Sequence, residues 1–92
     1  MQEKIFVYVL RSDVDAERHY VGLTSNVITR VAAHNAGQSV YTARDRPWSL
    51  VVSIEFCSER LARRFEHYLK SGSGRAFARR HFADAPRSDD AM

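Results

Sequence analysis

The sequence is poor in cysteine and has no long apolar run. Its only cysteine, Cys57, has no partner for an internal disulfide, so we expect a small buried or edge side chain in a reducing compartment. No apolar stretch has the form of a signal peptide or the length of a membrane span. Internal repeats and a metal-binding cluster of cysteines and histidines are also missing from the sequence. These absences predict a cytoplasmic protein with no membrane attachment.

What is present is one small basic domain. The 92 residues, 45% of them hydrophobic, suffice for one modest core. We expect residues 1–83 to form this domain and the polar residues 84–92 to be a disordered tail. The formal net charge is +3, and between positions 60 and 80 the only acid is Glu66. The basic residues of that run are Arg60, Arg63, Arg64, Lys70, Arg75, Arg79 and Arg80. This asymmetry favours a nucleic-acid partner over a merely solvated surface.

Two short apolar runs flanking a polar turn predict a β-hairpin, namely Ile5–Leu10 and His19–Leu23. If the turn centres near Val14, Tyr8 lies opposite Tyr20, and the two phenols project from one face. Gly22 then lies opposite Phe6 and leaves room for something bulky to approach. We therefore place Gly22 among the candidate nucleic-acid contacts.

A helix should follow the hairpin. Ser25 or Asn26 can cap it, and Gly37 can end it in a left-handed turn. Its expected core-facing residues are Val27, Ile28, Val31 and Ala32. Arg30 and His34 are four residues apart, so they share one edge beside this apolar stripe. A guanidinium next to an imidazole suits a phosphate, whereas the alternative is an ordinary solvated helix edge.

The third predicted strand alternates apolar and other residues from Leu50 to Phe56. The loop before it carries an aromatic residue and two arginines, Tyr41, Arg44 and Arg46, which can hold DNA through stacking and phosphate contacts. For Trp48, packing against the margin of the sheet is the better interpretation.

Two further helices are expected after this strand. Ser58 can cap the first and Gly72 can end it, with an apolar face of Leu61, Ala62, Phe65, Tyr68 and Leu69. Glu66 falls on the rim of that face, where it either pairs outward with Arg63 or Lys70 or points toward the sheet, which we favour. A glycine-serine joint then leads to a third helix over residues 75–82.

Together these residues resemble the GIY-YIG nuclease superfamily, in particular its small single-domain members. The resemblance rests on the order and spacing of Phe6-Val7-Tyr8, Tyr20-Val21-Gly22, Arg30, His34 and Glu66, and it runs from about Ile5 to Phe82. It implies an endonuclease that cuts phosphodiester bonds with one divalent metal, Mg²⁺ or Mn²⁺. It also implies that the two tyrosines, Arg30 and His34 are catalytic and that Glu66 binds the metal.

The sequence departs from the family pattern in two places. Phe6 stands where the first glycine of the family name would be, and this difference has little effect on the resemblance if the side chain at that position only packs against its neighbours. No asparagine follows Glu66, although many active members carry one in the helical region after the acid. Ser71 or Ser73 is a candidate to replace it.

The residue types allow three general bases. A phenol has an unperturbed pKa near 10 and serves as a base only if nearby cations lower its pKa. We favour Tyr8, with Tyr20 orienting water or phosphate, while His34 remains a contender because its pKa lies near neutrality. Arg30 would hold a non-bridging phosphate oxygen.

We therefore expect an α/β (α+β) domain with a three-stranded antiparallel sheet flanked by about three helices, and a metal-dependent DNA endonuclease, structure-specific in repair or recombination. Candidate DNA contacts besides Gly22 are Arg44, Arg46, Lys70, Arg75, Arg79 and Arg80. The alternative is a nucleic-acid-binding module of the same fold with weak or no cleavage. A protein–protein adaptor with core tyrosines fits the basic run less well. The oligomeric state is left open.

Overall fold

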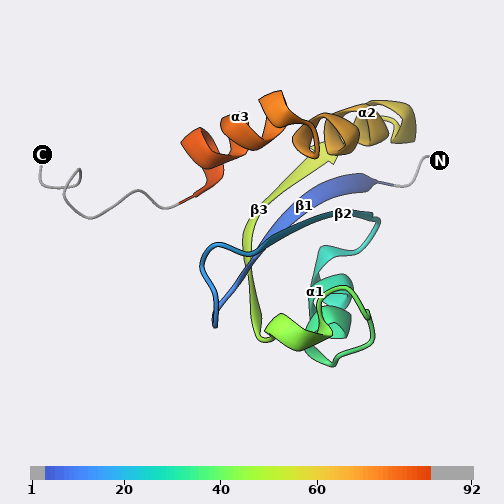
Figure 1. Ribbon diagram of the computed structural model, residues 1–92. Coiled ribbons are helices and arrows are strands. Elements are labelled where there is room, and N and C mark those ends of the chain that lie inside the picture. The colour runs from blue at the N-terminus through green and yellow to red at the C-terminus, as the bar shows by residue number, and fades with distance from the viewer. Residues whose placement is uncertain (1–3, 84–92) are drawn as a thin grey trace, which may run out of the picture.

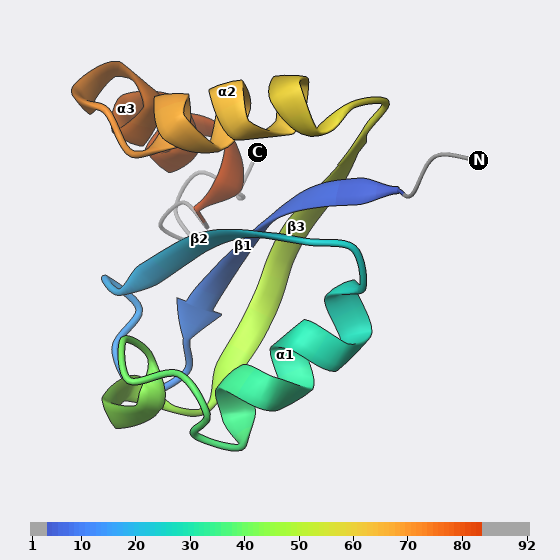
Figure 2. The ribbon, with the colours of Figure 1, turned by 90° about the vertical axis from the view of Figure 1, so that its right-hand side faces the viewer.

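A computed structural model of the protein describes residues 4–83, which form an α+β fold with one antiparallel sheet. The expected tail at residues 84–92 lies outside the described residues. The elements, in chain order, are β1 (Ile5–Ser12), β2 (His19–Thr24), α1 (Val27–Asn35), a short 3-10 helix η1 (Ala43–Asp45), β3 (Trp48–Phe56), α2 (Glu59–Leu69) and α3 (Gly72–Phe82). Figures 1 and 2 show α1 on one face of the sheet and the α2–α3 pair on the other.

The strand order is β2-β1-β3, so β1 is the central strand and carries Tyr8 in its middle. The predicted hairpin is confirmed, but its predicted register is wrong by two residues. Tyr8 lies opposite Gly22, and Leu10 lies opposite Tyr20, while Phe6 faces Thr24 instead of Gly22. A shift of two residues preserves the side-chain alternation, so both tyrosines still project from one face.

Ser12 explains the register. This buried residue is still part of β1, and its hydroxyl accepts hydrogen bonds from the backbone amides of Val14 and Asp15. The turn therefore begins one residue later than a turn centred on Val14 would, and each strand residue meets a partner two positions further along.

The pairing of β1 with β3 contains a shift. Val9 lies opposite Val52, but the next residue, Leu10, lies opposite Leu50. Val51 is the extra residue on β3, as in a β-bulge. The strand was expected from Leu50 onward, and it begins two residues earlier, at Trp48.

Helix α1 begins and ends as predicted. The side chain of Asn26 caps it by accepting a hydrogen bond from the Thr29 amide. Gly37 follows the helix with φ of 81°, a left-handed conformation that favours glycine. Asn35 ties the end of α1 to β3, because its amide group bonds both the backbone N–H and the carbonyl of Trp48, at 2.6 and 3.0 Å.

The buried face of α1 differs from the prediction. His34 is only 2% exposed, so it lies in the core and not beside it, whereas Ile28 is 84% exposed. Ala32 is also exposed. The residues turned inward are Val27, Val31 and His34, which follow helical spacing, and the docked face is therefore rotated from the one that the apolar residues alone indicate.

Helices α2 and α3 are capped by serines, Ser58 and Ser71. Helix α2 ends at Leu69 without needing Gly72, which is already part of α3. Gly74 makes the joint possible, since an added Cβ would lie 1.8 Å from the carbonyl oxygen of Tyr68. The joint is shorter than predicted, because only Lys70 and Ser71 lie between the helices, and α3 begins at Gly72 and not at residue 75.

Two hydrophobic clusters, one on each face of the sheet, hold the layers together. On the α2 side, Val7 and Val9 of β1 pack with Ala62 and Leu69 of α2. On the α1 side the cluster is formed by Tyr8, Leu10 and Trp48, with Tyr20 and Val31 packed against it. Trp48 packs on the sheet as predicted, whereas Cys57 is exposed.

Candidate active site

Tyr8 is the centre of the site and is almost fully buried, with 1% of its surface exposed. It is placed by β1 and lies across Gly22 of β2. A Cβ added at Gly22 would lie 2.5 Å from the Tyr8 hydroxyl oxygen. The space over the glycine is therefore filled by the phenol ring and is not open to DNA. This corrects the prediction that Gly22 contacts nucleic acid.

A chain of hydrogen bonds runs inward from Tyr8. Its hydroxyl lies 2.8 Å from Nε2 of His34, and Nδ1 of His34 lies 2.7 Å from the hydroxyl of Thr42. Thr42 is fully buried, and its backbone carbonyl accepts a hydrogen bond from the indole of Trp48 at 2.8 Å. Both imidazole nitrogens thus have partners, which fixes the orientation of the ring.

Tyr20 and Arg30 complete the cluster from β2 and α1. The Tyr20 ring lies 4.8 Å from the imidazole of His34 and 6.2 Å from the ring of Tyr8. Tyr20 is half-buried and Arg30 is exposed, so these two side chains lie between buried Tyr8 and the surface. Arg30 and His34 also line an open hollow of about 400 Å³ together with Val40 and Tyr41. A phosphate entering there would meet the guanidinium.

Burial determines the protonation of the pair. Desolvation raises the pKa of the Tyr8 hydroxyl, and the hydrogen bond and positive charge of Arg30 offset only part of that effect. Burial, assisted by the charge of Arg30, lowers the pKa of His34. At neutral pH Tyr8 is therefore protonated and His34 neutral. Arg30 thus lowers the pKa of the Tyr8 hydroxyl as expected of a nearby cation, but burial outweighs it.

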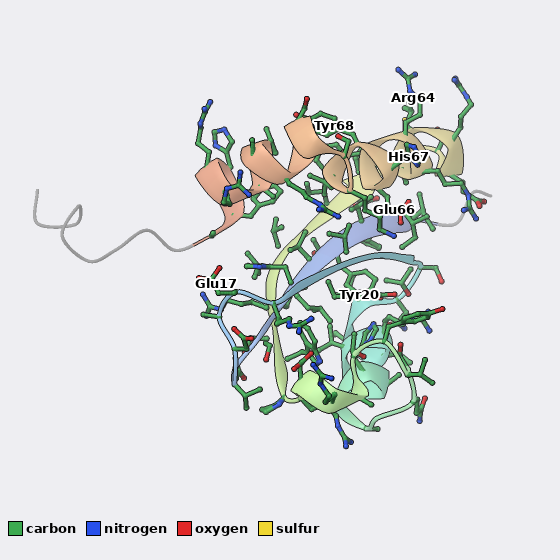
Figure 3. The ribbon with its side chains drawn as sticks, viewed as in Figure 1. Glu17, Tyr20, Arg64, Glu66, His67 and Tyr68 are labelled. Carbon is green, nitrogen blue, oxygen red and sulfur yellow. The ribbon has the colours of Figure 1, made fainter. Side chains whose placement is uncertain are left out.

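Glu66 is not part of this cluster. It is carried by α2, which packs on the other face of the sheet. Within residues 4–83 its interaction partner is Lys70, whose Nζ lies 2.5 Å from Oε2 of Glu66. Its side chain is 20% exposed and lies on the sheet side of α2, while Arg64 points away from the sheet (Figure 3). Both orientations considered for Glu66 thus apply, because it faces the sheet and pairs with Lys70.

The donor set at Glu66 fits a single hard cation. Within the described residues, no group of three or more histidines, cysteines or acids lies close enough together to hold a metal ion. The described residues therefore do not form a site in which protein side chains supply most of the ligands. Mg²⁺ commonly uses one or two carboxylates and keeps several waters, and Glu66 can supply one carboxylate. Lys70 competes for it, but the Lys70 side chain is 54% exposed and can rotate into solvent.

The predicted DNA contacts fall on two sides. Arg44 lies within η1 and Arg46 directly follows it, and η1 lies beside α1 (Figure 2). The others belong to the α2–α3 layer, namely Lys70, Arg75, Arg79 and Arg80. All of these side chains are exposed, although Arg46 also folds over Gly37. The two sets therefore do not form one continuous contact surface.

The serines considered in place of the missing asparagine differ in availability. The hydroxyl of Ser71 donates to the carbonyl of Tyr68 at 2.6 Å and accepts from the amide of Gly74 at 3.1 Å. Ser71 is therefore engaged as a helix cap. Ser73 is exposed in the first turn of α3.

Comparison with known proteins decides the family. A model of the GIY-YIG catalytic domain matches residues 4–80, which include every residue of the cluster and Glu66. The chain belongs to the GIY-YIG nuclease family. The catalytic roles of the individual side chains of this GIY-YIG domain stay predictions.

The relatives of this GIY-YIG chain include small proteins of similar length. A UPF0213 protein of Natronomonas pharaonis is 45% identical over 80 residues, covering 86% of this chain and 91% of its own length. A UPF0213 protein of Staphylococcus haemolyticus is 38% identical over 71 residues, with 76% and 84% covered. The structure-specific endonuclease subunit SLX1 of Podospora anserina is 39% identical over 66 residues, which are 65% of this chain and 19% of that protein.

Thr42 is a site residue that sequence reasoning missed. A threonine in a polar loop carries no signal of burial, and the GIY-YIG resemblance assigns it no role. Only the folded path of the loop brings it under His34. Separately, none of the helices in residues 4–83 is long and apolar enough to span a bilayer, and a cytoplasmic location stays a prediction.

Proposed function

We propose that this protein is a divalent-metal-dependent DNA endonuclease that recognises DNA structure, with Tyr8 and His34 handling the proton of the attacking water. The observation that carries the proposal is the convergence of Tyr8, Tyr20, Arg30 and His34 from three elements into one cluster, of which Arg30 and His34 line a surface hollow. Membership of the nuclease family and the name of the SLX1 relative support DNA as the substrate. A role in repair or recombination would follow from such a substrate.

The hydrogen-bond chain provides a route for the proton. Neutral His34 can donate Nδ1–H to Thr42 and accept the Tyr8 proton at Nε2, 2.8 Å away. As water attacks phosphorus, Tyr8 takes a proton from the water and passes its own to His34, so the phenol need not be ionised beforehand. The candidate bases thereby become one unit, in which Tyr8 contacts the reacting water and His34 stores the proton.

The remaining residues would bind and orient the substrate. Arg30 would hold a non-bridging phosphate oxygen through two donors and balance the charge that develops there. Tyr20, the less buried phenol, would orient the water or the phosphate. Glu66 would hold the cation, which would supply charge neutralisation at a phosphate. Lys70 would have to release the carboxylate to allow this. Because Glu66 lies on the α2 side of the sheet, DNA would have to pass the edge strand β2 to contact both this cation and Arg30.

The decisive experiment compares Glu66→Gln with Glu17→Gln on the same labelled branched DNA. Both changes remove one carboxylate charge, but Glu17 lies in the exposed hairpin turn. With Mg²⁺, we expect wild type and Glu17→Gln to cleave, Glu66→Gln to lose cleavage while retaining DNA affinity, and chelator to stop all cleavage. Cleavage by Glu66→Gln at the wild-type rate would refute the metal assignment.

The second candidate is a DNA-binding module with little or no cleavage. The observation that favours it is the Glu66–Lys70 ion pair, which occupies the only carboxylate assigned to metal. Tight DNA binding by the wild type with no cleavage in either Mg²⁺ or Mn²⁺ would select this candidate.

A further inference from the structure

The outer face of α2, which turns away from the sheet, carries a stripe of basic and aromatic side chains. Arg60, Arg64, His67 and Tyr68 follow one another at helical spacing and line an open hollow of about 630 Å³. Figure 3 shows Arg64 extending outward from this side of the helix. The stripe is separate from the tyrosine cluster, because α2 and the sheet lie between the two surfaces (Figures 1 and 2).

The arginines of this stripe have no acidic partners in the described part of the chain. Two ion pairs neutralise the other charges of α2, since Arg63 pairs with Glu59 at 2.7 Å and Lys70 pairs with Glu66. No acid of residues 4–83 pairs with Arg60 or Arg64. The face therefore presents at least two uncompensated positive charges to any anion.

These positions are also unfavourable for the isolated helix. Arg60 lies in the first turn of α2, where the helix dipole disfavours a cation. Arg60 and Arg64 are four residues apart, so their like charges repel along one edge. Neither arrangement assists folding, and both become favourable when an anionic ligand covers the face.

The aromatic member of the stripe is rigid and partly exposed. Tyr68 is 38% exposed, and its ring packs against Phe65 and Phe77 at centroid distances of 6.1 and 6.0 Å. Arginines beside a fixed aromatic ring suit the phosphates and sugars of a nucleic acid, because the guanidinium binds phosphate through two donors and the ring offers a flat contact.

We propose that this face of α2 binds the phosphate backbone of a second nucleic-acid segment while the tyrosine cluster holds the segment to be cut. The inference rests on the proposed function for the identity of the first segment. Its consequence is that one molecule engages two arms of a branched substrate, or two separate duplexes, on opposite sides of its sheet.

The test is energy transfer between two short duplexes, one carrying a donor and one an acceptor dye, in chelator so that no cleavage occurs. The test variant combines Arg60→Gln and Arg64→Gln. The control combines Lys4→Gln and Arg18→Gln, which removes the same charge from exposed positions elsewhere. We expect wild type and control to bring the duplexes together, and the test variant to lose the transfer while still binding one duplex.

Two further readouts accompany this test. The salt dependence of the second binding event should weaken by about 1.8 in log K against log[salt] in the test variant, at about 0.9 for each phosphate that an arginine no longer neutralises. Its thermal midpoint without DNA should be equal to or above that of the wild type, because the replaced charges repel each other.

Several results would overturn the proposal. Energy transfer by the test variant equal to the control, or none by the wild type, would exclude a second nucleic-acid site on α2. Loss of polyglutamate binding in the test variant with unchanged DNA transfer would assign the face to an acidic protein. If the wild type shows energy transfer but cannot cleave DNA in Mg²⁺, the proposed endonuclease function is wrong and the second nucleic-acid site on α2 still holds.

Discussion

Gly22→Ala should disable the site without replacing any side chain that has a proposed chemical role. The added Cβ would lie 2.5 Å from the Tyr8 hydroxyl oxygen and 2.7 Å from the ring carbon that bears it, whereas ordinary contact begins at 3.4 Å. The difference between 3.4 and 2.5 Å requires the hydroxyl to move by about 0.9 Å. A move of that size along the bond to His34 would stretch it from 2.8 Å to about 3.7 Å, beyond hydrogen-bonding distance.

Three contributions determine the loss of stability. Overpacking a filled site costs about 1–3 kcal/mol, and separating two buried polar groups costs about 1–3 kcal/mol more if they find no new partners. The alanine also stabilises the folded protein by about 0.4–1 kcal/mol, because it lowers the conformational entropy of the unfolded chain. We expect a net loss of about 1 to 5.6 kcal/mol. In a domain of this size each kcal/mol lowers the melting temperature by about 4–8 °C.

The assays are thermal unfolding and single-turnover cleavage. Misplacing a catalytic group by about 1 Å can cost about 10²-fold in rate, so Gly22→Ala should cleave at least that much more slowly. Gly72→Ala is the matched control, because a Cβ there meets no atom within 4 Å. It should leave cleavage unchanged and raise helix stability by up to about 1 kcal/mol.

A double variant separates the contact from general effects. Tyr8→Phe removes the atom nearest to the new Cβ, so in the double variant Gly22→Ala should cost less stability than it does alone. Wild-type melting and wild-type cleavage by Gly22→Ala would refute the placement of Tyr8 over the glycine.

Four further predictions concern the tyrosine cluster and its hydrogen-bond chain. Because burial lowers the pKa of His34, cleavage should be level with pH down to about 6.5, the ordinary histidine value, and fall only below it; a decline that starts at higher pH would contradict a neutral His34 as proton acceptor. The free energy of unfolding should also fall as pH falls, because the unfolded chain binds a proton at His34 at higher pH than the folded protein does. Urea titrations of wild type and His34→Gln over pH 5–8 would measure this difference. Tyr8→Phe should change stability by about 1 kcal/mol and turnover by about 10²-fold or more, whereas Tyr20→Phe should slow turnover less, and equal rates in the two would reverse their assigned roles. Thr42→Val leaves Nδ1 of His34 buried without a partner and should cost about 1–3 kcal/mol, while Thr42→Ser should melt near the wild type if the hydroxyl is what matters.

The elements of this fold could be predicted from sequence because their signals are local. The apolar run of β1, the period of two in β3, and the caps Asn26, Ser58 and Gly37 can be recognised without knowledge of distant residues. The hairpin register could not be obtained this way, since it depends on Ser12 staying in the strand and bonding the amides of the turn. An apolar pattern alone cannot detect that contribution.

In the candidate site, too, the local features could be predicted and the features that depend on distant contacts could not. Sequence reasoning placed Tyr8 and Tyr20 on one face, and the structure brings both to His34. His34 was expected beside the apolar stripe, on one edge with Arg30, because the two residues are four apart in the helix. The sequence could not indicate that two hydrogen bonds would satisfy the ring in the core. The distance of Glu66 from the cluster also depends on which face of the sheet α2 covers, which no local pattern reveals.

The extra residue Val51 in β3 changes the face of the sheet on which the even-numbered side chains of β3 lie. Past the bulge, Val52 and Val9 pair on the α2 side; before it, Leu50 and Leu10 pair on the α1 side. In an uninterrupted strand Trp48 would share the face of Val52. The indole reaches the Thr42 carbonyl because the bulge takes Val51 out of the regular pairing. A substitution that straightened the bulge, with Val51 paired like its neighbours, would turn Trp48 to the opposite layer and remove the support beneath Thr42, whereas deleting Val51 would leave Trp48 opposite Ser12. The alignment of the proton route thus depends on a backbone irregularity at a residue outside the hydrogen-bond chain.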